Sequence, residues 1–497
     1  MSGPISPQHD YLPPPPGEFI GHPKPLWMLF AAEFWERFSY YGMRALLAVY
    51  VATTFFGLLP EGEANAAASL TYGAYTALVY ATAIFGGYIA DRYLGYQRSI
   101  MLGGALMAAG MFLLLVENLN VFLIGLAVIV VGNGLFKPNI STMVGKLYSP
   151  GDPRRDSGFT IFYMGINAGA LIAPIICGAW IGALYGFKWG FFAAGIGMVF
   201  GIMVFQALSG WLGHVGKPPE GAEGYGRLLK VLIGAIAAVP VVYFLLSQSV
   251  IAGYILVVMM VALAVYFVSS GIRSGDKVQM QRYIAMLILF VANMMFWALF
   301  EQAGSSLNFL ARDYVDAPFH FSLFQSANPV FILLLAPIFA AMWPRLEKHG
   351  INPSIPRKFA FGLLGVGIGF LVLVLAIKAV GDSGGKIPWL MLALCYLIHT
   401  MGELCLSPIG LSMVTKLAAP KEVGMAMGGW FLSIAMGNFV AGAIASIASG
   451  GGGHGEAASG LDQYLVTFNQ LIWLGCGAAV VFFLFAPMIN KLMHGVK

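Results

Sequence analysis

Long apolar segments recur along this chain, and each is followed by a short polar stretch before the next begins. Because the hydrocarbon core of a bilayer is about 30 Å thick, a helix that crosses it needs about 20 predominantly apolar residues. The breaks between the segments predict 14 such helices, in groups of six, two and six. The first six are predicted at residues 26–57, 68–92, 97–117, 120–147, 157–184 and 187–213. The middle pair is predicted at 227–247 and 250–272, and the last six at 282–305, 322–343, 356–380, 387–418, 422–449 and 462–492.

This grouping predicts four regions. Residues 1–25 have a run of four prolines and no apolar core, so we expect a disordered N-terminal segment there. Residues 26–213 and 282–497 are each expected to form a six-helix bundle. Residues 214–281 are expected to be a linker that contains the two additional transmembrane helices.

The composition agrees with an all-α polytopic membrane protein. Of the 497 residues, 59% are hydrophobic and only 10% are charged, whereas a soluble domain has about 25% charged residues. The mean hydropathy is +0.80. All four cysteines lie inside apolar segments without metal-ligand spacing, so we expect packing roles for them and no metal site. They are Cys177, Cys395, Cys405 and Cys476.

The placement of lysine and arginine predicts the orientation of the chain. With the first helix starting in the cytoplasm, 20 of the 27 Lys and Arg residues fall on the cytoplasmic side, as membrane proteins prefer. Only Lys188, Arg312, Lys378 and Lys386 fall outside. We therefore expect a multi-pass protein of the plasma (bacterial inner) membrane with both termini cytoplasmic. The net charge of +5 reflects this topology, so we expect no nucleic-acid partner. We do expect the protein to contact membrane lipid.

The first predicted helix is unusual because it carries charged residues in its interior. At 100° per residue, Glu33, Arg37, Tyr40 and Arg44 fall within a stripe about 60° wide, with Glu36 at its edge. The stripe climbs roughly 16 Å, about half of the bilayer core. Because a charge facing lipid at that depth costs several kcal/mol, these groups must face protein or a water-filled cavity.

Three further charged residues lie in the membrane interior on predicted helices: Lys137, Glu301 and Glu403. The charges thus occupy helices 1, 4, 7 and 10, which are matching positions in the two bundles. Static ion pairs that fix helix packing would explain them, but buried pairs are weak stabilisers, which favours a functional role. Carboxylates placed beside cations in such surroundings can take up and release protons near neutral pH. His399, four residues before Glu403, fits helix packing better than a proton relay.

At this point the residues resemble a known family. Glu33-x-x-Glu36-Arg37-Phe38-x-Tyr40-Tyr41-Gly42 resembles the helix 1 signature of the proton-dependent oligopeptide transporters, a branch of the major facilitator superfamily. Further resemblance lies in four segments: Gly134-x-x-Lys137-Pro138-Asn139, Phe162-Tyr163-x-x-Ile166-Asn167-x-Gly169, Trp297-x-x-x-Glu301-Gln302 and Gly402-Glu403-Leu404-x-x-Ser407-Pro408. The extra helical pair is similar to the insertion of bacterial members. The resemblance implies a major facilitator fold and proton-coupled import of di- and tripeptides by alternating access.

The resemblance also implies roles for individual residues. Arg44 and Lys137 would attract the peptide carboxylate, while Glu403, helped by Asn167 and Asn328, would hold the amino group. The side-chain pockets would be shaped by Tyr40, Tyr80, Tyr163, Trp297, Ser407 and Trp430. Proton coupling would involve Glu33, Glu36, Arg37, Lys137 and Glu301. An Arg44–Glu301 pair would help to close the outer side and a Lys137–Glu403 pair the inner side.

The physical chemistry of a peptide supports this interpretation independently. A di- or tripeptide zwitterion carries opposite charges about 5–9 Å apart, at roughly 3.3–3.6 Å per extended residue. Cations on one bundle and a carboxylate on the other recognise that dipole without reading side chains, so peptide-like drugs are also expected partners. No cofactor is expected, and protons serve as the coupling ion.

Three other functions compete with this one. A facilitator for nitrate, a drug or a sugar would share the fold. An intramembrane enzyme is disfavoured, because the chain has neither a His-Glu-x-x-His metal motif nor a Gly-x-Ser-x-Gly elbow. A structural or signalling membrane protein is disfavoured by the charges in the membrane interior.

Overall fold

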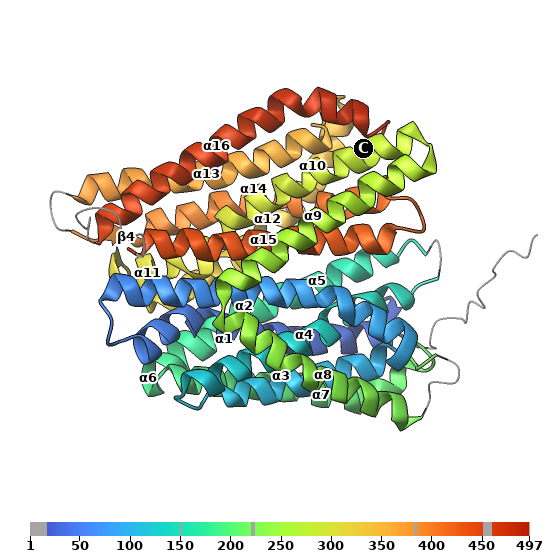
Figure 1. Ribbon diagram of the computed structural model, residues 1–497, viewed down its shortest axis with the longest axis horizontal. Helices are drawn as coiled ribbons and strands as arrows, with labels where there is room; N and C mark the ends of the chain where they lie inside the picture. Colours follow the sequence, from blue (N-terminus) through green and yellow to red (C-terminus); the bar gives the residue numbers. More distant parts are fainter. Residues whose placement is uncertain (1–16, 150–151, 220–223, 382–384, 451–459, 497) are drawn as a thin grey trace, which may run out of the picture.

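Nearly parallel long helices form two bundles that lie side by side, with the first bundle in blue and green and the second in yellow to red (Figure 1). This computed structural model describes residues 17–149, 152–219, 224–381, 385–450 and 460–496. The 14 predicted membrane-spanning helices are present, which confirms the all-α polytopic fold. Twelve helical spans in the described chain are long and apolar enough to cross a membrane. The other two predicted spans correspond to the charged first helix and to the third helix.

The first bundle contains six spans, several of which change helical form near an end. They are α1 (Lys24–Tyr50) with the π-helical turn η1 (Val51–Phe55), α2 (Glu61–Ile89) with η2 (Ala90–Leu94), α3 (Tyr96–Leu113), α4 (Leu119–Lys146), α5 (Arg155–Ala173) with η3 (Pro174–Gly182) and α6 (Ala183–Tyr185), and α7 (Phe187–Leu208) with the 3-10 turn η4 (Ser209–Leu212).

The second bundle also contains six spans. They are α10 (Lys277–Phe300) with the 3-10 turn η5 (Glu301–Gly304) and α11 (Ser306–Asp313), the 3-10 segment η6 (Phe321–Ser326) with α12 (Ala327–Lys348), α13 (Ile355–Gly381), α14 (Trp389–Leu417), α15 (Val423–Ala448) and α16 (Leu461–Leu492). The seventh predicted helix, 282–305, is therefore interrupted, because the α-helix ends at Phe300 and Glu301 opens a tighter turn.

The two additional helices, α8 (Tyr225–Ser247) and α9 (Ser249–Ser274), join the bundles. Helix α8 packs on α4 and α2 of the first bundle, whereas α9 packs on α10 and α15 of the second. Only Gln248 separates the two helices. At the far end of α9, Glu422 accepts hydrogen bonds from Ser270 (2.6 Å) and from Tyr283 of α10. The pair thus spans both bundles.

The segment before α1 departs from the predicted disorder over the residues that the structure describes. The short strands β1 (Glu18–Phe19) and β2 (His22–Pro23) pair antiparallel. Arg154 forms an ion pair with Glu18 at 2.7 Å, and the hydroxyl of Tyr148 lies 2.8 Å from a ring nitrogen of His22. These contacts fix the segment against the α4–α5 connection. The rest of the predicted disordered segment, residues 1–16, lies outside the described residues.

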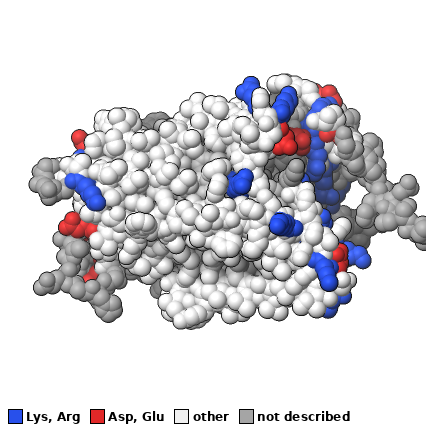
Figure 2. All heavy atoms as spheres, turned by 90° about the horizontal axis from the view of Figure 1, so that it is seen from above, with Lys and Arg blue, Asp and Glu red and all other residues white. Residues whose placement is uncertain are grey.

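Side-chain distribution follows the predicted topology. Lys and Arg side chains gather at the end of the molecule where the C-terminus lies, and a broad belt with few charges separates the two ends (Figures 1 and 2). At the opposite end, β3 (Val315–Asp316) pairs in parallel with β4 (Ile387–Pro388). We call this second end, which also contains residues 56–60 between η1 and α2, the outer end, after the predicted orientation.

Candidate functional site

The charged stripe of α1 is buried inside the protein, as its spacing predicted. The exposed fractions are 2% for Glu33, 0% for Glu36, 4% for Arg37 and 8% for Arg44. These side chains therefore contact protein and not lipid. Their partners fall into two groups that lie about two helical turns apart on α1.

The first group, which we call the acidic cluster, consists of Glu33, Glu36 and Arg37. The Nε atom of Arg37 lies 3.1 Å from Glu33 Oε1 and also donates to Glu36 Oε2. Asn133 on α4 donates to Glu36 Oε1 at 3.3 Å. Within the described structure, Glu33 Oε2 and Arg37 Nη2 are buried without a hydrogen-bond partner. One arginine therefore serves two carboxylates, and the cluster carries one excess negative charge when all three groups are ionised.

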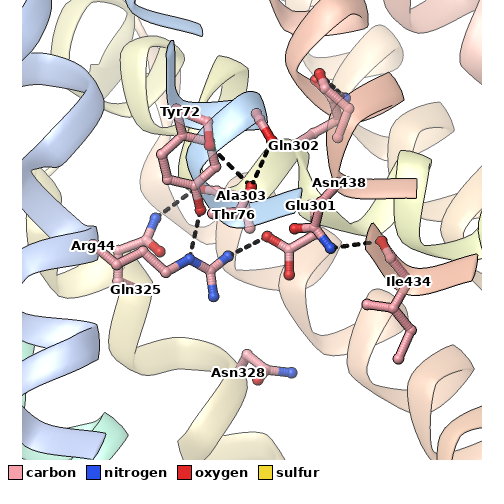
Figure 3. A network of polar contacts seen from close by, with 12 residues as sticks. Arg44, Tyr72, Thr76, Glu301, Gln302, Ala303, Gln325, Asn328, Ile434 and Asn438 are labelled. Carbon is pink, nitrogen blue, oxygen red and sulfur yellow. Dashed lines mark hydrogen bonds and ion pairs between the residues drawn. The ribbon is translucent and has the colours of Figure 1, made fainter. Parts of the chain in front are cut away.

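The second group, which we call the outer gate, joins the two bundles (Figure 3). Arg44 Nη2 donates to Glu301 Oε2 at 2.6 Å, and Arg44 Nε donates to the hydroxyl of Tyr72 on α2 at 2.6 Å. Glu301 and Tyr72 are both buried. The pair between Arg44 and Glu301 that the family resemblance implied is thus formed in this conformation.

A local break in the seventh span places Glu301 in the gate. Because the α-helix stops at Phe300, the carbonyl of Ala303 is free of the helical ladder. It accepts hydrogen bonds from the side chains of Gln325 (2.5 Å) and Tyr396 (3.3 Å). Side chains from neighbouring helices therefore satisfy the turn and hold it against the first bundle.

Further contacts between the bundles lie at the same end. Asn308 of α11 donates to the carbonyl of Ala45 at 3.0 Å, and Ser326 of η6 donates to that of Leu171 at 2.8 Å. Helices α2 and α15 pack closely here as well. The outer end is therefore closed by hydrogen bonds and close helix packing in addition to the ion pair.

On the second bundle, Glu403 is held by Asn328. The amide nitrogen of Asn328 donates to Glu403 Oε2 at 2.8 Å and lies 3.0 Å from the Thr400 hydroxyl. Among the described residues, Glu403 forms no ion pair. The neighbouring His399 is 1% exposed and its Nε2 lies 3.1 Å from the carbonyl of Val366, which fits the expected packing role.

Lys137 on α4 is likewise without a carboxylate partner. Its Nζ lies 3.9 Å from the centre of the Tyr80 ring, and no ion pair involves it in the described parts of the chain. The inner pair of Lys137 with Glu403 is therefore not formed while the outer pair is. Lys137 is also not among the ion-paired groups of the acidic cluster, so its place in the coupling network that the family resemblance implied stays a prediction.

The residues expected to shape side-chain pockets are in varied environments. Tyr163 on α5 is 40% exposed, and Asn167 donates to its carbonyl at 2.9 Å. Trp297 donates from its indole nitrogen to Asn293 at 3.1 Å. Ser407 is half-buried, one turn after Glu403. Tyr40 is 5% exposed, with the guanidinium of Arg37 5.4 Å from its ring centre.

Trp430 differs from the expectation in this conformation. It is 2% exposed and packs between the rings of Phe290 and Phe359, each with centroids 6.2 Å away. Its side chain here fills the interior of the second bundle, so its role in a pocket stays a prediction.

Two polar residues of the site were not identified from the sequence. Tyr72 lies four and eight residues before Thr76 and Tyr80, so one stripe of α2 carries all three polar side chains. Asn133 lies four residues before Lys137, on the same face of α4. These helical spacings were signals that could have identified both. No group of three or more His, Cys, Asp or Glu side chains could hold a metal ion among the residues described.

Along most of its length, the chain is similar to known proteins. Residues 97–457 match the POT family. The chain is 39% identical to the peptide transporter YePEPT of Yersinia enterocolitica, over 96% of this chain and 97% of that protein. It is 32% identical to the dipeptide and tripeptide permease B of Aeromonas hydrophila, over 97% of this chain and 96% of that protein. A crystal structure of a mutant peptide transporter POT in complex with alafosfalin superposes with a TM-score of 0.82 at 37% identity, covering 97% of this chain and 98% of that one.

Proposed function

This chain belongs to the POT family of membrane transporters, and we propose that it imports di- and tripeptides together with protons. The relatives are transporters and permeases and not enzymes, and the 14 helices make this a multi-pass membrane protein. We propose that it lies in the bacterial inner membrane. We propose that both termini are cytoplasmic, because Lys and Arg side chains gather at the end of the molecule where the C-terminus lies (Figures 1 and 2).

One observation carries the substrate assignment: each bundle presents a partly buried charge without an ion-pair partner among the described residues, and the two charges are of opposite sign. Lys137 of the first bundle and Glu403 of the second are both in this state among the described residues. An uncompensated charge inside a protein is costly, so its retention is best explained by a ligand that completes the pair. A peptide zwitterion supplies both partners at once, with a carboxylate for Lys137 and an ammonium group for Glu403.

The remaining site residues then have defined tasks. Arg44 attracts the peptide carboxylate when Glu301 is no longer its partner. Asn328 orients Glu403, and Asn167 donates a hydrogen bond to the backbone carbonyl of Tyr163. Aromatic and hydroxyl groups form pockets that accept varied side chains and peptide-like drugs, because aromatic rings combine apolar faces with polar tips. These are Tyr40, Tyr80, Tyr163, Trp297, Ser407 and Trp430.

Alternating access follows from where the ion pairs can form. The Arg44–Glu301 pair exists only when the bundles meet at the outer end, and a Lys137–Glu403 pair only when they meet at the inner end. Each pair therefore favours one conformation. Protonation of Glu301 removes one charge of the outer pair and favours outward opening, so a proton is taken up before the peptide.

The acidic cluster supplies a second place for a proton. Glu33 Oε2 is buried without a hydrogen-bond partner in the described structure, so it can accept a proton without first breaking a hydrogen bond. A proton on Glu33 leaves Arg37 paired one-to-one with Glu36. The cluster then becomes neutral, which is the favourable state in a medium of low dielectric. Proton movement through this cluster is the coupling step in our proposal.

Uptake by purified protein in liposomes tests the function. With an inward proton gradient, a labelled dipeptide should accumulate, and a protonophore should abolish the accumulation. Accumulation that survives the protonophore would contradict proton coupling. An excess of unlabelled di- and tripeptide should compete, whereas nitrate and sugars should not, which separates this proposal from the facilitators for other substrates.

A further inference from the structure

Tyr72 holds one side of the Arg44 guanidinium while Glu301 holds the other (Figure 3). Arg44 Nε donates to the Tyr72 hydroxyl at 2.6 Å, and Arg44 Nη2 donates to Glu301 Oε2 at 2.6 Å. Tyr72 is 1% exposed and belongs to the same bundle as Arg44, whereas Glu301 belongs to the other bundle. Separation of the bundles therefore removes Glu301 from Arg44 but leaves Tyr72 in place.

Tyr72 also contacts the second bundle, at Gly304. Gly304 ends the turn that begins at Glu301, and a Cβ atom at position 304 would overlap the hydroxyl and ring carbons of Tyr72. Gly304 does not have a positive φ, so this close approach, and not the backbone conformation, excludes a side chain there. In this conformation the carboxylate of Glu301 reaches Arg44 while the tip of Tyr72 lies directly against Gly304.

We propose that Tyr72 is a positioning residue of the outer gate. It orients Arg44 in both conformations, and it contacts Gly304 of the other bundle when the outer end closes. In the closed state its hydroxyl keeps the guanidinium in line with Glu301. In the open state it keeps the freed guanidinium directed toward the cavity, ready for the peptide carboxylate. This inference rests on the proposed alternating access of a peptide transporter.

Helix α2 offers a matched control for the hydroxyl. Tyr75 lies three residues after Tyr72 and is 0% exposed, but its hydroxyl has no hydrogen-bond partner in the described structure. Tyr72→Phe and Tyr75→Phe therefore remove the same atom from the same helix at similar burial. A general effect of losing a buried hydroxyl would appear in both variants, whereas an effect of positioning Arg44 would appear only in the first.

The glycine has a matched control in the second bundle. A Cβ at Gly428 on α15 would meet only ordinary contacts, the nearest being Ile84 side-chain atoms at 3.7 Å. Gly304→Ala and Gly428→Ala thus add the same methyl group, and only the first forces Tyr72 to move. A double variant, Tyr72→Leu with Gly304→Ala, removes the overlapping phenol tip and should restore room for closure.

The test measures outer-end distances between spin labels on cysteines introduced at Leu58 and Asp316, which are exposed positions of the first and second bundle. Three of the four cysteines are buried and Cys476 is partly exposed, so Cys476 is replaced by serine. We expect Gly304→Ala to shift the distance distribution to longer values, Gly428→Ala to leave it unchanged, and Tyr72→Leu with Gly304→Ala to return it toward the parent. A Gly304→Ala distribution equal to that of Gly428→Ala would overturn the closure contact.

Transport kinetics test the orientation of Arg44. Because a hydrogen bond to a charged group is lost, Tyr72→Phe should raise the KM of a free dipeptide by about threefold or more. It should leave the KM of the C-terminally amidated form unchanged, while Tyr75→Phe changes neither. Equal KM changes for both peptides, or none in Tyr72→Phe, would overturn the positioning role. The distance measurements need no substrate, so they decide the gate contact even if the chain proves not to carry peptides.

Discussion

Two ionic groups on α1 lie about two helical turns apart, yet they are built in different ways. The acidic cluster takes Glu33, Glu36 and Arg37 from one short stretch of a single helix. The outer gate joins Arg44 to Glu301, which lies 257 residues further along the chain and in the other bundle. Movement of the bundles can break only the second group. The members of the first group lie on one helix, so movement of the bundles does not separate them, and we expect this group to respond to a change of protonation.

The two groups also differ in how completely their polar atoms are hydrogen-bonded. In the gate, Arg44 has a carboxylate and a hydroxyl on two of its nitrogens. In the cluster, Glu33 Oε2 and Arg37 Nη2 have no partner among the described residues, and a buried unsatisfied polar atom costs about 1–3 kcal/mol. In our proposal, helix α1 therefore carries both a conformational gate, with partners on two bundles, and a proton site, with partners on one helix.

The largest effect is expected from neutralising the acidic cluster. Glu33→Gln or Glu36→Gln should abolish gradient-driven uptake but leave peptide counterflow, because exchange requires no net proton movement. In each variant the other glutamate still neutralises Arg37, which limits damage to folding. Glu117→Gln, at an exposed ion pair with Lys188, is the control. Loss of both driven uptake and counterflow in a folded protein would instead indicate a structural cluster.

A smaller effect is expected from blocking the peptide termini. An amidated C-terminus leaves Arg44 and Lys137 imperfectly paired, which costs about 2–5 kcal/mol and weakens competition by roughly 30-fold or more. Acetylation of the N-terminus should likewise weaken binding through Glu403. The measurement is inhibition of labelled dipeptide uptake by each blocked peptide. If both compete as well as the free peptide, recognition of the termini by charge is wrong.

Neutralising the gate should shift conformation without abolishing binding. Glu301→Gln removes a charged hydrogen bond worth about 1.5–3 kcal/mol, so the outward-open population should rise roughly tenfold to a hundredfold. Label distances across the outer ends of α1 and α11 should lengthen and lose their dependence on pH. Should pH-dependent opening persist unchanged in this variant, the conformational proton switch would lie in the acidic cluster.

The smallest effect is expected at the edge of the outer end. Glu61 pairs with Arg312 at 3.0 Å, but the Glu61 side chain is 69% exposed. An exposed pair contributes at most about 1 kcal/mol, so Glu61→Gln should change the outward population less than about fivefold. The same label distances measure it. A shift as large as that of Glu301→Gln would mean that burial does not distinguish the two pairs.

Much of this architecture could be predicted from the sequence because lipid imposes strong rules. Apolar length determined the 14 helices, and the cost of charge in lipid required the stripe of α1 to face inward. Burial of Glu33, Glu36, Arg37 and Arg44 confirms that reasoning. These properties are local, so single-sequence patterns contain them.

The properties that could not be predicted arise only when distant segments meet. The spacing of Tyr72 with Thr76 and Tyr80 could place it on a polar stripe, but only the fold shows that its hydroxyl reaches Arg44. The helix ends at Phe300, and side chains from distant segments, Gln325 and Tyr396, donate hydrogen bonds to the carbonyl of Ala303. The separation of Lys137 from Glu403 belongs to one conformation, and a sequence encodes more than one.

The most direct test of the central claim, that peptide movement is tied to proton movement, is peptide-driven acidification of liposomes that contain only this protein. A pH-sensitive dye inside the vesicles should report acidification when a free dipeptide is added outside, and no change when the peptide is blocked at both termini. Vesicles that contain the Glu33→Gln variant should exchange peptide by counterflow without internal acidification. Peptide uptake by the unmodified protein without any change of internal pH would contradict the account.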